Sequence, residues 1–260
     1  MENYDDVIFK TICLKKNFSD YQSIKYPEII IKRKKINIIQ GTTGIGKTSL
    51  LNLLGLMDKT DFNLSESESD VLYRPEPNLK EISYRRDVYN NSKKEVSLIR
   101  NDFGFLFQHD HLLDDMTCRE NIEIRYFLKF PGQKKDEVKI KTDILLELKG
   151  FQDLKYQENT NSPPPINRSP ASLSGGQRHR VALLRALIHS PRVLFTDEPL
   201  ASVDEKTAKS IVEVLVEEVH KKGVTIIAVI HDKEKDLFSD SSEMLNIIDL
   251  NNSTVVNFIN

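Results

Sequence analysis

The chain has 260 residues, which is enough for one large domain with a buried core. Lysine and arginine number 37 and aspartate and glutamate 39, so the formal net charge is −2. This near balance excludes bulk electrostatic attraction to nucleic acid or to an anionic membrane, and no nucleic-acid partner is expected. Two cysteines, Cys13 and Cys118, are too few for a disulfide framework.

No targeting or membrane-spanning segment is recognisable. The N-terminal sequence MENYDDVIFK is charged and lacks the apolar core of a signal peptide. The longest apolar runs, such as VTIIAVI from Val224, fall far short of the roughly 18 residues that a membrane span needs. These features predict a soluble, cytoplasmic chain.

The first predicted elements are strands. TICLKK and EIIIKRKK are expected to add strands, antiparallel to the rest, at the N-terminal side of the sheet. INIIQ, which begins at Ile36, is β-branched and apolar on consecutive positions, as strands buried on both faces of a parallel sheet are.

A glycine-rich loop follows that strand. Gly41, Gly44, Gly46, Lys47 and Thr48 satisfy the P-loop pattern G-x-x-x-x-G-K-[ST], and an amphipathic helix, KTSLLNLLGLM, follows. Glycines let backbone N–H groups approach phosphate oxygens, and the start of the helix adds its positive dipole. Lysine should reach the β- and γ-phosphates and the threonine hydroxyl should ligate Mg²⁺. The alternative is a chance glycine turn.

Two segments then interrupt the alternation of strands and helices. Residues 61–101 are polar, with SESESD, RPEP and YNNSKKE, and predict a surface insertion. Residues 109–172 are mostly helical in pattern and end in the proline-rich stretch NTNSPPPINRSPAS.

The second buried strand, RVLFTD from Arg192, ends in two carboxylates. Asp197 and Glu198 lie at its C-terminal end, where open α/β sheets bind ligands. Asp197 would hold Mg²⁺, and Glu198 could orient and deprotonate an attacking water. The alternative is an ordinary polar turn, D-E-P. A helix, EKTAKSIVEVLVEEVHKKG, and a third buried strand, TIIAVIHD from Thr225, come next.

The alternation predicts an α/β fold: a P-loop NTPase core with a mostly parallel sheet, an N-terminal antiparallel β subdomain and an inserted α-helical subdomain. The whole chain, 1–260, is expected to form a single domain. Its core would comprise 1–108 and 173–260, with 109–172 as the helical subdomain and 61–101 as the insertion.

Further motifs resemble those of the ABC-type ATPases. The sequence Leu173-Ser174-Gly175-Gly176-Gln177 matches the signature of that family. In the same order as in the family, Gln108 resembles the Q-loop glutamine, Asp204 the D-loop aspartate and His231 the switch histidine. With the P-loop and the acidic strand end, six motifs support the resemblance across most of the chain.

The resemblance implies a site shared between two chains. In ABC proteins the signature docks on ATP held by the P-loop of a partner, so a head-to-tail dimer of two copies, or of this chain and a homologous ATPase subunit, is expected. ATP and Mg²⁺ are the expected cofactors. The predicted roles are as follows: catalytic, Glu198, His231, Gln108 and Lys47; ATP-binding, Gly41, Thr42, Thr43, Gly44, Ile45, Gly46, Lys47, Thr48, Ser49 and Phe18; ATP contacts to the partner's nucleotide, Ser174, Gly175, Gly176, Gln177 and Asp204; metal, Thr48, Gln108 and Asp197.

Several of these residues also have a structural interpretation. Gln108 could be an end-of-strand amide, His231 a core histidine, and Asp204 a helix cap. Phe18 is the aromatic chosen to stack on adenine, with Tyr21 and Tyr26 as alternatives. His109, His111 and His189 are expected at the surface or in packing, because no Cys/His spacing predicts zinc.

The segment FGFLFQHDHLLDDMTCRENIEIRYFL resembles the lipoprotein-releasing, macrolide-exporter and cell-division ATPases. The resemblance implies separate integral membrane permease subunits, and a position at the inner face of the cell membrane through them. Leu112, Leu113, Met116 and Ile122 either line a groove for the permease or form subdomain core. The sequence IIDLNNSTVV has NNS where a family hairpin often has glycine. The alternative function is a soluble ABC ATPase of a cytosolic assembly complex, of the iron–sulfur-assembly type.

Overall fold

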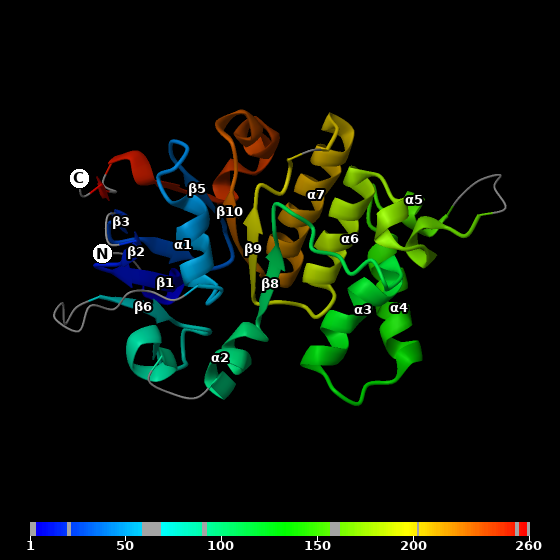
Figure 1. The fold of residues 1–260 in the computed structure, drawn as a ribbon, viewed down its shortest axis with the longest axis horizontal. Coiled ribbons are helices and arrows are strands. Elements are labelled where there is room, and N and C mark those ends of the chain that lie inside the picture. Colours follow the sequence, from blue (N-terminus) through cyan, green and yellow to red (C-terminus); the bar gives the residue numbers. More distant parts are fainter. Residues whose placement is uncertain are drawn as a thin grey trace.

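The computed structural model describes residues 4–19, 22–58, 69–89, 93–156, 162–201, 203–252 and 255–258 (Figure 1). At its centre is a parallel sheet with the strand order β11-β5-β10-β9-β8. Its strands are β5 (Ile36–Gln40), β8 (Phe103–Leu106), β9 (Val193–Asp197), β10 (Thr225–Val229) and β11 (Leu245–Asp249). The three predicted buried strands therefore lie side by side in the middle, and β8 and β11 form the two edges.

Each central strand alternates between two apolar layers. Ile38, Leu194 and Ala228 belong to one buried cluster, and Ile39, Phe195 and Val229 belong to the other. Helices α6 (Gly175–Leu187) and α7 (Glu205–Lys222) belong to the first cluster, and α1 (Lys47–Leu54) to the second. Burial on both faces explains why these strands read as continuous apolar runs.

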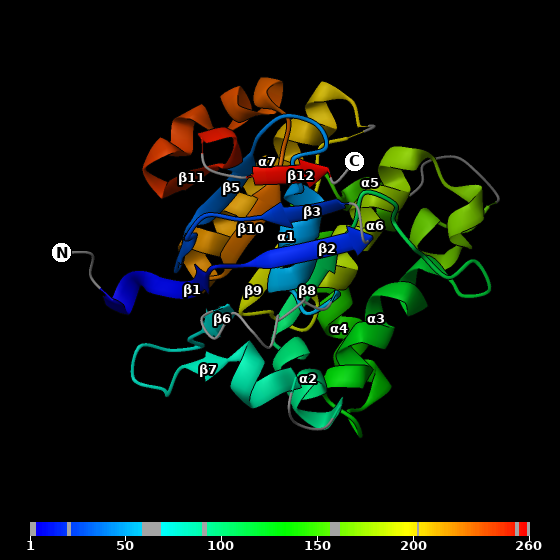
Figure 2. The same cartoon turned by 60° about the vertical axis from the view of Figure 1, so that its left-hand side comes forward.

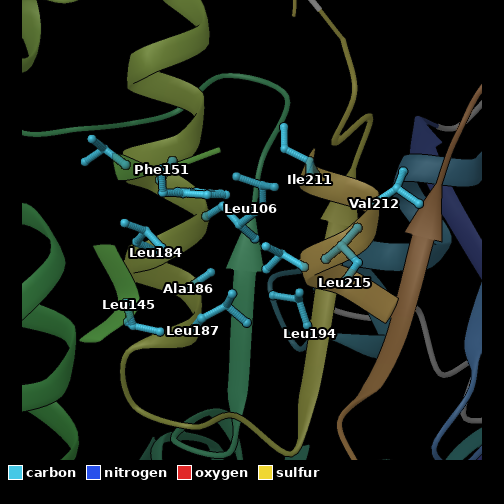
Figure 3. Close-up of a cluster of buried hydrophobic side chains, with 14 of the residues drawn as sticks. Leu106, Leu145, Phe151, Leu184, Ala186, Leu187, Leu194, Ile211, Val212 and Leu215 are labelled. Atoms are coloured by element: carbon cyan, nitrogen blue, oxygen red, sulfur yellow. The ribbon is translucent and has the colours of Figure 1, made fainter. Parts of the chain in front are cut away.

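The helical part packs against α6. It contains α3 (Cys118–Lys129), α4 (Lys135–Leu146) and the short α5 (Gln152–Lys155). Figure 3 shows Leu184 and Leu187 of α6 lying between Leu106 on β8 and Leu145 on α4. The apolar core is thus continuous from the sheet into the helical part. Short 3₁₀ segments complete the helices: Tyr4–Asp6, Pro165–Asn167, Pro170–Ser172, Asp232–Met244 and Leu250–Asn252.

Two antiparallel sheets lie at the other side of the molecule. One has the order β4-β1-β6-β7, from β1 (Val7–Ile12), β4 (Ile30–Lys32), β6 (Asp70–Tyr73) and β7 (Ile82–Ser83). The other has the order β12-β3-β2, from β2 (Lys15–Ser19), β3 (Gln22–Lys25) and β12 (Val255–Phe258), and its ribbons cross in front of α1 in Figure 2. The predicted fold, with an antiparallel part and inserted helices, is confirmed.

The segment 61–101 differs from the polar surface insertion that was expected, in the part that the structure describes. β6 pairs with β1, and Val71, Tyr73 and Tyr84 are fully buried. A π-helix (Tyr84–Tyr89) and α2 (Lys93–Arg100) follow. Four side chains of this segment are therefore part of the second core cluster: Val71, Tyr73, Tyr84 and Val88. Within the described ranges, no helix is both long and apolar enough to cross a membrane.

Candidate active site

The turn between β5 and α1 has the backbone of a phosphate-binding loop. Gly46 precedes α1 with φ 98°, a left-handed conformation that side chains disfavour. A Cβ atom on Gly46 would lie 2.7 Å from Ile24 Cδ1 and 2.7 Å from the Tyr26 hydroxyl oxygen. Glycine is therefore required here by both conformation and space.

Lys47 already has hydrogen-bond partners within this loop. Its Nζ donates to the carbonyl oxygens of Gly41 at 2.7 Å and Thr42 at 3.2 Å. The ammonium group therefore lies over the loop, where a phosphate would be cradled, and its hydrogen bonds would be exchanged for phosphate oxygens on binding.

The C-terminal region also supports the loop, which the sequence did not predict. Asn251 Oδ1 accepts a hydrogen bond of 2.9 Å from the backbone N–H of Thr42. The Asn251 N–H in turn donates to Asp249 Oδ1 at 2.9 Å. The NNS stretch thus contributes an oxygen to the P-loop that glycine at position 251 would lack.

Three predicted residues meet at the carboxylate of Glu198. Gln108 Nε2 donates to Glu198 Oε2 at 2.7 Å, and His231 Nε2 lies 3.2 Å from Glu198 Oε1. Gln108 follows β8, Glu198 follows β9 and His231 follows β10, so the parallel strands bring the three side chains to one edge. The arrangement holds a carboxylate between an amide and an imidazole, as positioning of a water molecule would require.

The backbone of Glu198 is strained. Its φ of 52° is left-handed, although it is not glycine. The Glu198 N–H donates to the carbonyl oxygen of Val229 at 2.9 Å, and its own carbonyl accepts from the Ala201 N–H at 3.1 Å. Such conformations cost about 1–3 kcal/mol and cluster at functional sites.

Asp197 ends β9 directly before Glu198, and its buried side chain hydrogen-bonds to Thr48. Burial raises the pKa of Asp197, the Thr48 hydrogen bond lowers it, and the charge of Glu198 raises it again. A carboxylate and a hydroxyl are hard oxygen donors of the kind that Mg²⁺ binds together with substrate phosphates and water. Thr48 and Asp197, which share a hydrogen bond, therefore fit a site completed by phosphate.

The signature segment begins α6. Ser174 caps this helix: its Oγ accepts from the Gln177 N–H, and Gln177 Oε1 accepts from the Ser174 N–H, both at 3.2 Å. Ser174 and Gly175 are exposed. In Figure 1 the start of α6 and the turn before α1 lie along the same edge, on opposite sides of β8 and β9. The exposed start of α6 is therefore directed to solvent at a distance from its own P-loop.

Comparison with known proteins decides the family. Residues 25–201 match the family model described as ABC transporter. The chain belongs to the ABC transporter ATPases. This family membership makes it an ATP-binding subunit and an ATPase.

Individual relatives agree. The lipoprotein-releasing system ATP-binding protein LolD of Aquifex aeolicus is 32% identical over 85% of this chain and 86% of LolD. The macrolide export ATP-binding/permease protein MacB of Bartonella quintana is 32% identical over 90% of this chain and 31% of MacB. The dimeric structure of the ATP-binding cassette MJ0796 in a post-hydrolysis state, bound to ADP and Pi, superposes with a TM-score of 0.73 at 25% identity, covering 95% and 98% of the two chains. The predicted resemblance to ABC ATPases of this branch is confirmed.

The remaining predicted ABC residues are placed as follows. Asp204 caps α7, accepting from the Thr207 N–H at 3.0 Å, and its side chain is exposed. Phe18 lies on β2 and is 46% exposed, so its ring is accessible to a ligand. Tyr26 is buried and hydrogen-bonded to the P-loop, which leaves no face for adenine. Tyr21 lies outside the described residues.

Of the four residues predicted to line a groove or to form the subdomain core, two lie in the core and two are more exposed. Ile122 is fully buried and Leu112 packs against the same cluster, so these two belong to the core. Leu113 is 50% exposed and Met116 is half-buried. His189 is buried, as a packing residue would be, and His109 and His111 are exposed.

Proposed function

We propose that this ABC ATPase works as a head-to-tail dimer that drives separate membrane permease subunits. The observation that supports this proposal is the separation of two phosphate-binding elements within one chain, the P-loop and the start of α6. The P-loop lies on one side of β8 and β9, while the exposed start of α6 lies on the other. A second copy, rotated by a two-fold axis, would bring its own signature to this P-loop.

In the proposed dimer each chain supplies a complementary half of the site. Lys47 would bind the β- and γ-phosphates, and Ser174 with Gly175 and Gly176 would bind the γ-phosphate of the partner's nucleotide through a helix start. Glu198 would take the proton of the attacking water, while Gln108 and His231 hold its carboxylate. Phe18 is the proposed adenine contact.

Mg²⁺ would be held by Thr48 and Asp197 with the phosphates, and Gln108 Oε1 is available as a further ligand since its Nε2 binds Glu198. When bound, the metal neutralises developing phosphate charge. The same residues position the γ-phosphate relative to Glu198.

A groove beside the Q-loop is the proposed permease contact. Its volume is about 860 Å³, and it lies between the sheet, α2 and the helical part. Exposed apolar side chains line it, including Met57 at 40% and Leu128 at 66% exposure. Phe107, which directly precedes Gln108, and His111, three residues after Gln108, line it as well. A bound helix would therefore touch the loop that carries a catalytic residue.

Membrane retention tests this proposal. The chain, co-expressed with the products of its neighbouring genes, should be recovered with washed membranes and should cross-link to a membrane-spanning subunit. Leu128→Asp should abolish recovery, whereas Ile140→Asp, which alters a similarly exposed residue of α4 (59%) outside the groove lining, should not.

Recovery only in the soluble fraction would reject the transport function. Association with cysteine-desulfurase partners instead would support the soluble assembly-type alternative. Recovery with washed membranes, together with a cross-link to a membrane-spanning subunit, would support the proposed position of the chain at the inner face of the membrane.

A further inference from the structure

His179 lies at a junction of three motifs. It is the fifth residue of α6, after the signature, and is only 4% exposed. Its Nδ1 lies 2.9 Å from Asp110 Oδ1, and its Nε2 lies 2.7 Å from the carbonyl oxygen of Pro199. Asp110 follows Gln108 by two residues, and Pro199 follows Glu198 directly. One ring therefore connects the signature helix to both loops that meet at the catalytic carboxylate.

Both partners of the ring are hydrogen-bond acceptors. A carbonyl oxygen only accepts, so Nε2 must carry hydrogen. A carboxylate also only accepts, so Nδ1 must carry hydrogen as well, unless Asp110 holds the proton instead. One hydrogen therefore lies between Nδ1 and Asp110 Oδ1 and another between Nε2 and the Pro199 carbonyl oxygen, so the ring makes a hydrogen bond on each side.

Other charged groups fix Asp110 in place. Arg185, one helical turn and a half further along α6, donates to the carbonyl oxygens of Asp110 and His111. Arg178 Nε lies 3.9 Å from Asp110 Oδ2. The Q-loop is therefore attached to α6 through both its backbone and the Asp110 side chain, and His179 extends this attachment to the loop after Glu198.

We propose that His179 is a positioning residue of the ATPase reaction, which holds the Gln108 and Glu198 loops in register through hydrogen bonds at both ring nitrogens. It touches neither nucleotide nor Glu198 and acts through Asp110 and Pro199. The inference rests on the ATPase activity of the family and not on the proposed permease.

Paired alanine variants test it. His179→Ala should lower kcat at least about tenfold, because small displacements of catalytic groups are costly, while the KM for ATP changes less than about threefold. His189→Ala is the matched control: His189 is also buried, at 1% exposure, and its Nε2 meets the Phe103 carbonyl oxygen at 3.1 Å, away from both loops. It should lower the unfolding temperature and leave kcat within about twofold.

Turnover of His179→Ala within twofold of the parental chain would overturn the inference, and so would an equal loss in His189→Ala. Failure of the chain to be recovered with membranes would reject the proposed permease role and would leave this inference unaffected, because the comparison uses ATP hydrolysis by the purified chain. Thermal melts of both variants establish that the compared proteins are folded.

Substitutions of Asp110 test the same link independently of His179→Ala. Asp110→Asn can meet Nδ1 with either its amide oxygen or its nitrogen and should retain most turnover, whereas Asp110→Ala should lose as much as His179→Ala. The double alanine variant should lose no more than either single one. Additive losses in the double variant would contradict the link between His179 and Asp110.

Discussion

The hydroxyl of Tyr26 donates a hydrogen bond of 3.0 Å to the carbonyl oxygen of Gly46, the last residue before α1. Burial raises the pKa of Tyr26, a hydrogen bond with Ser49 lowers it, and the charge of Asp58 raises it further. The phenol therefore remains a donor throughout the range in which the protein would be studied. Through this bond the antiparallel side of the molecule supports the phosphate-binding loop.

Tyr26→Phe should lower the free energy of unfolding by about 1 kcal/mol, since the Gly46 carbonyl loses a partner. Urea titration of the nucleotide-free chain measures the effect. Tyr156→Phe is the control, because Tyr156 is 59% exposed and its hydroxyl lies 3.4 Å from Glu147 Oε1, away from the loop. Equal unfolding midpoints for Tyr26→Phe and the parental chain would show that this hydrogen bond does not stabilise the loop.

Glu198→Gln should reduce ATP turnover by about 10²-fold or more, the scale expected for loss of a general base. ATP binding should persist, because Lys47 and the loop are untouched, and gel filtration with ATP should show an accumulated dimer. Glu213→Gln alters an exposed carboxylate on α7 that pairs with Lys149 and should leave turnover unchanged. Undiminished hydrolysis by Glu198→Gln would assign the base elsewhere.

Ser174→Arg should prevent dimer closure while leaving nucleotide binding to the monomer within about threefold of the parental affinity. The added side chain fills the exposed start of α6 and replaces the capping hydroxyl. Gln133→Arg adds the same charge to the exposed connection between α3 and α4 and is the control. A Ser174→Arg monomer that hydrolysed ATP at the parental rate would refute the shared site.

Acidification should destabilise the chain through His189. Burial, with Arg125 and Lys129 nearby, lowers the pKa of His189 to about 3, whereas the unfolded chain has the ordinary value of 6.5. Between these values only the unfolded state binds the proton, so stability falls as the pH drops through 6.5. From pH 7.5 to 5.5 the parental chain should lose about 1.4 kcal/mol more than His189→Asn does, as measured by urea unfolding. Parallel pH profiles for the two proteins would contradict this assignment.

Much of the site follows from local patterns. Strand ends of a parallel sheet share one edge, so the sequence alone predicts that Gln108, Glu198 and His231 lie close together. The P-loop glycines and the Ser174 cap depend on backbone geometry that neighbouring residues specify. These features are readable because each is encoded within a few positions of the chain.

Other features depend on distant pairings. β6 pairs with β1 across about sixty residues, and its three apolar residues, which follow Asp70 and precede Arg74, gave no sign that Tyr73 enters the core. The two partners of His179 lie 69 and 20 positions away. A histidine in a basic helix has no local pattern that distinguishes a buried link from a surface side chain.

The family pattern ends at residue 201, yet β11 lies beside β5, and Leu250 and Asn251 contact Gly41 and Thr42. A chain that ended between His231 and Leu245 would keep the catalytic side chains but would leave β5 without its neighbour β11 and the Thr42 N–H without the Asn251 oxygen. A shortened version of this protein should therefore extend at least to Asn252, because truncation between His231 and Asn252 would weaken nucleotide binding without removing any catalytic residue named above.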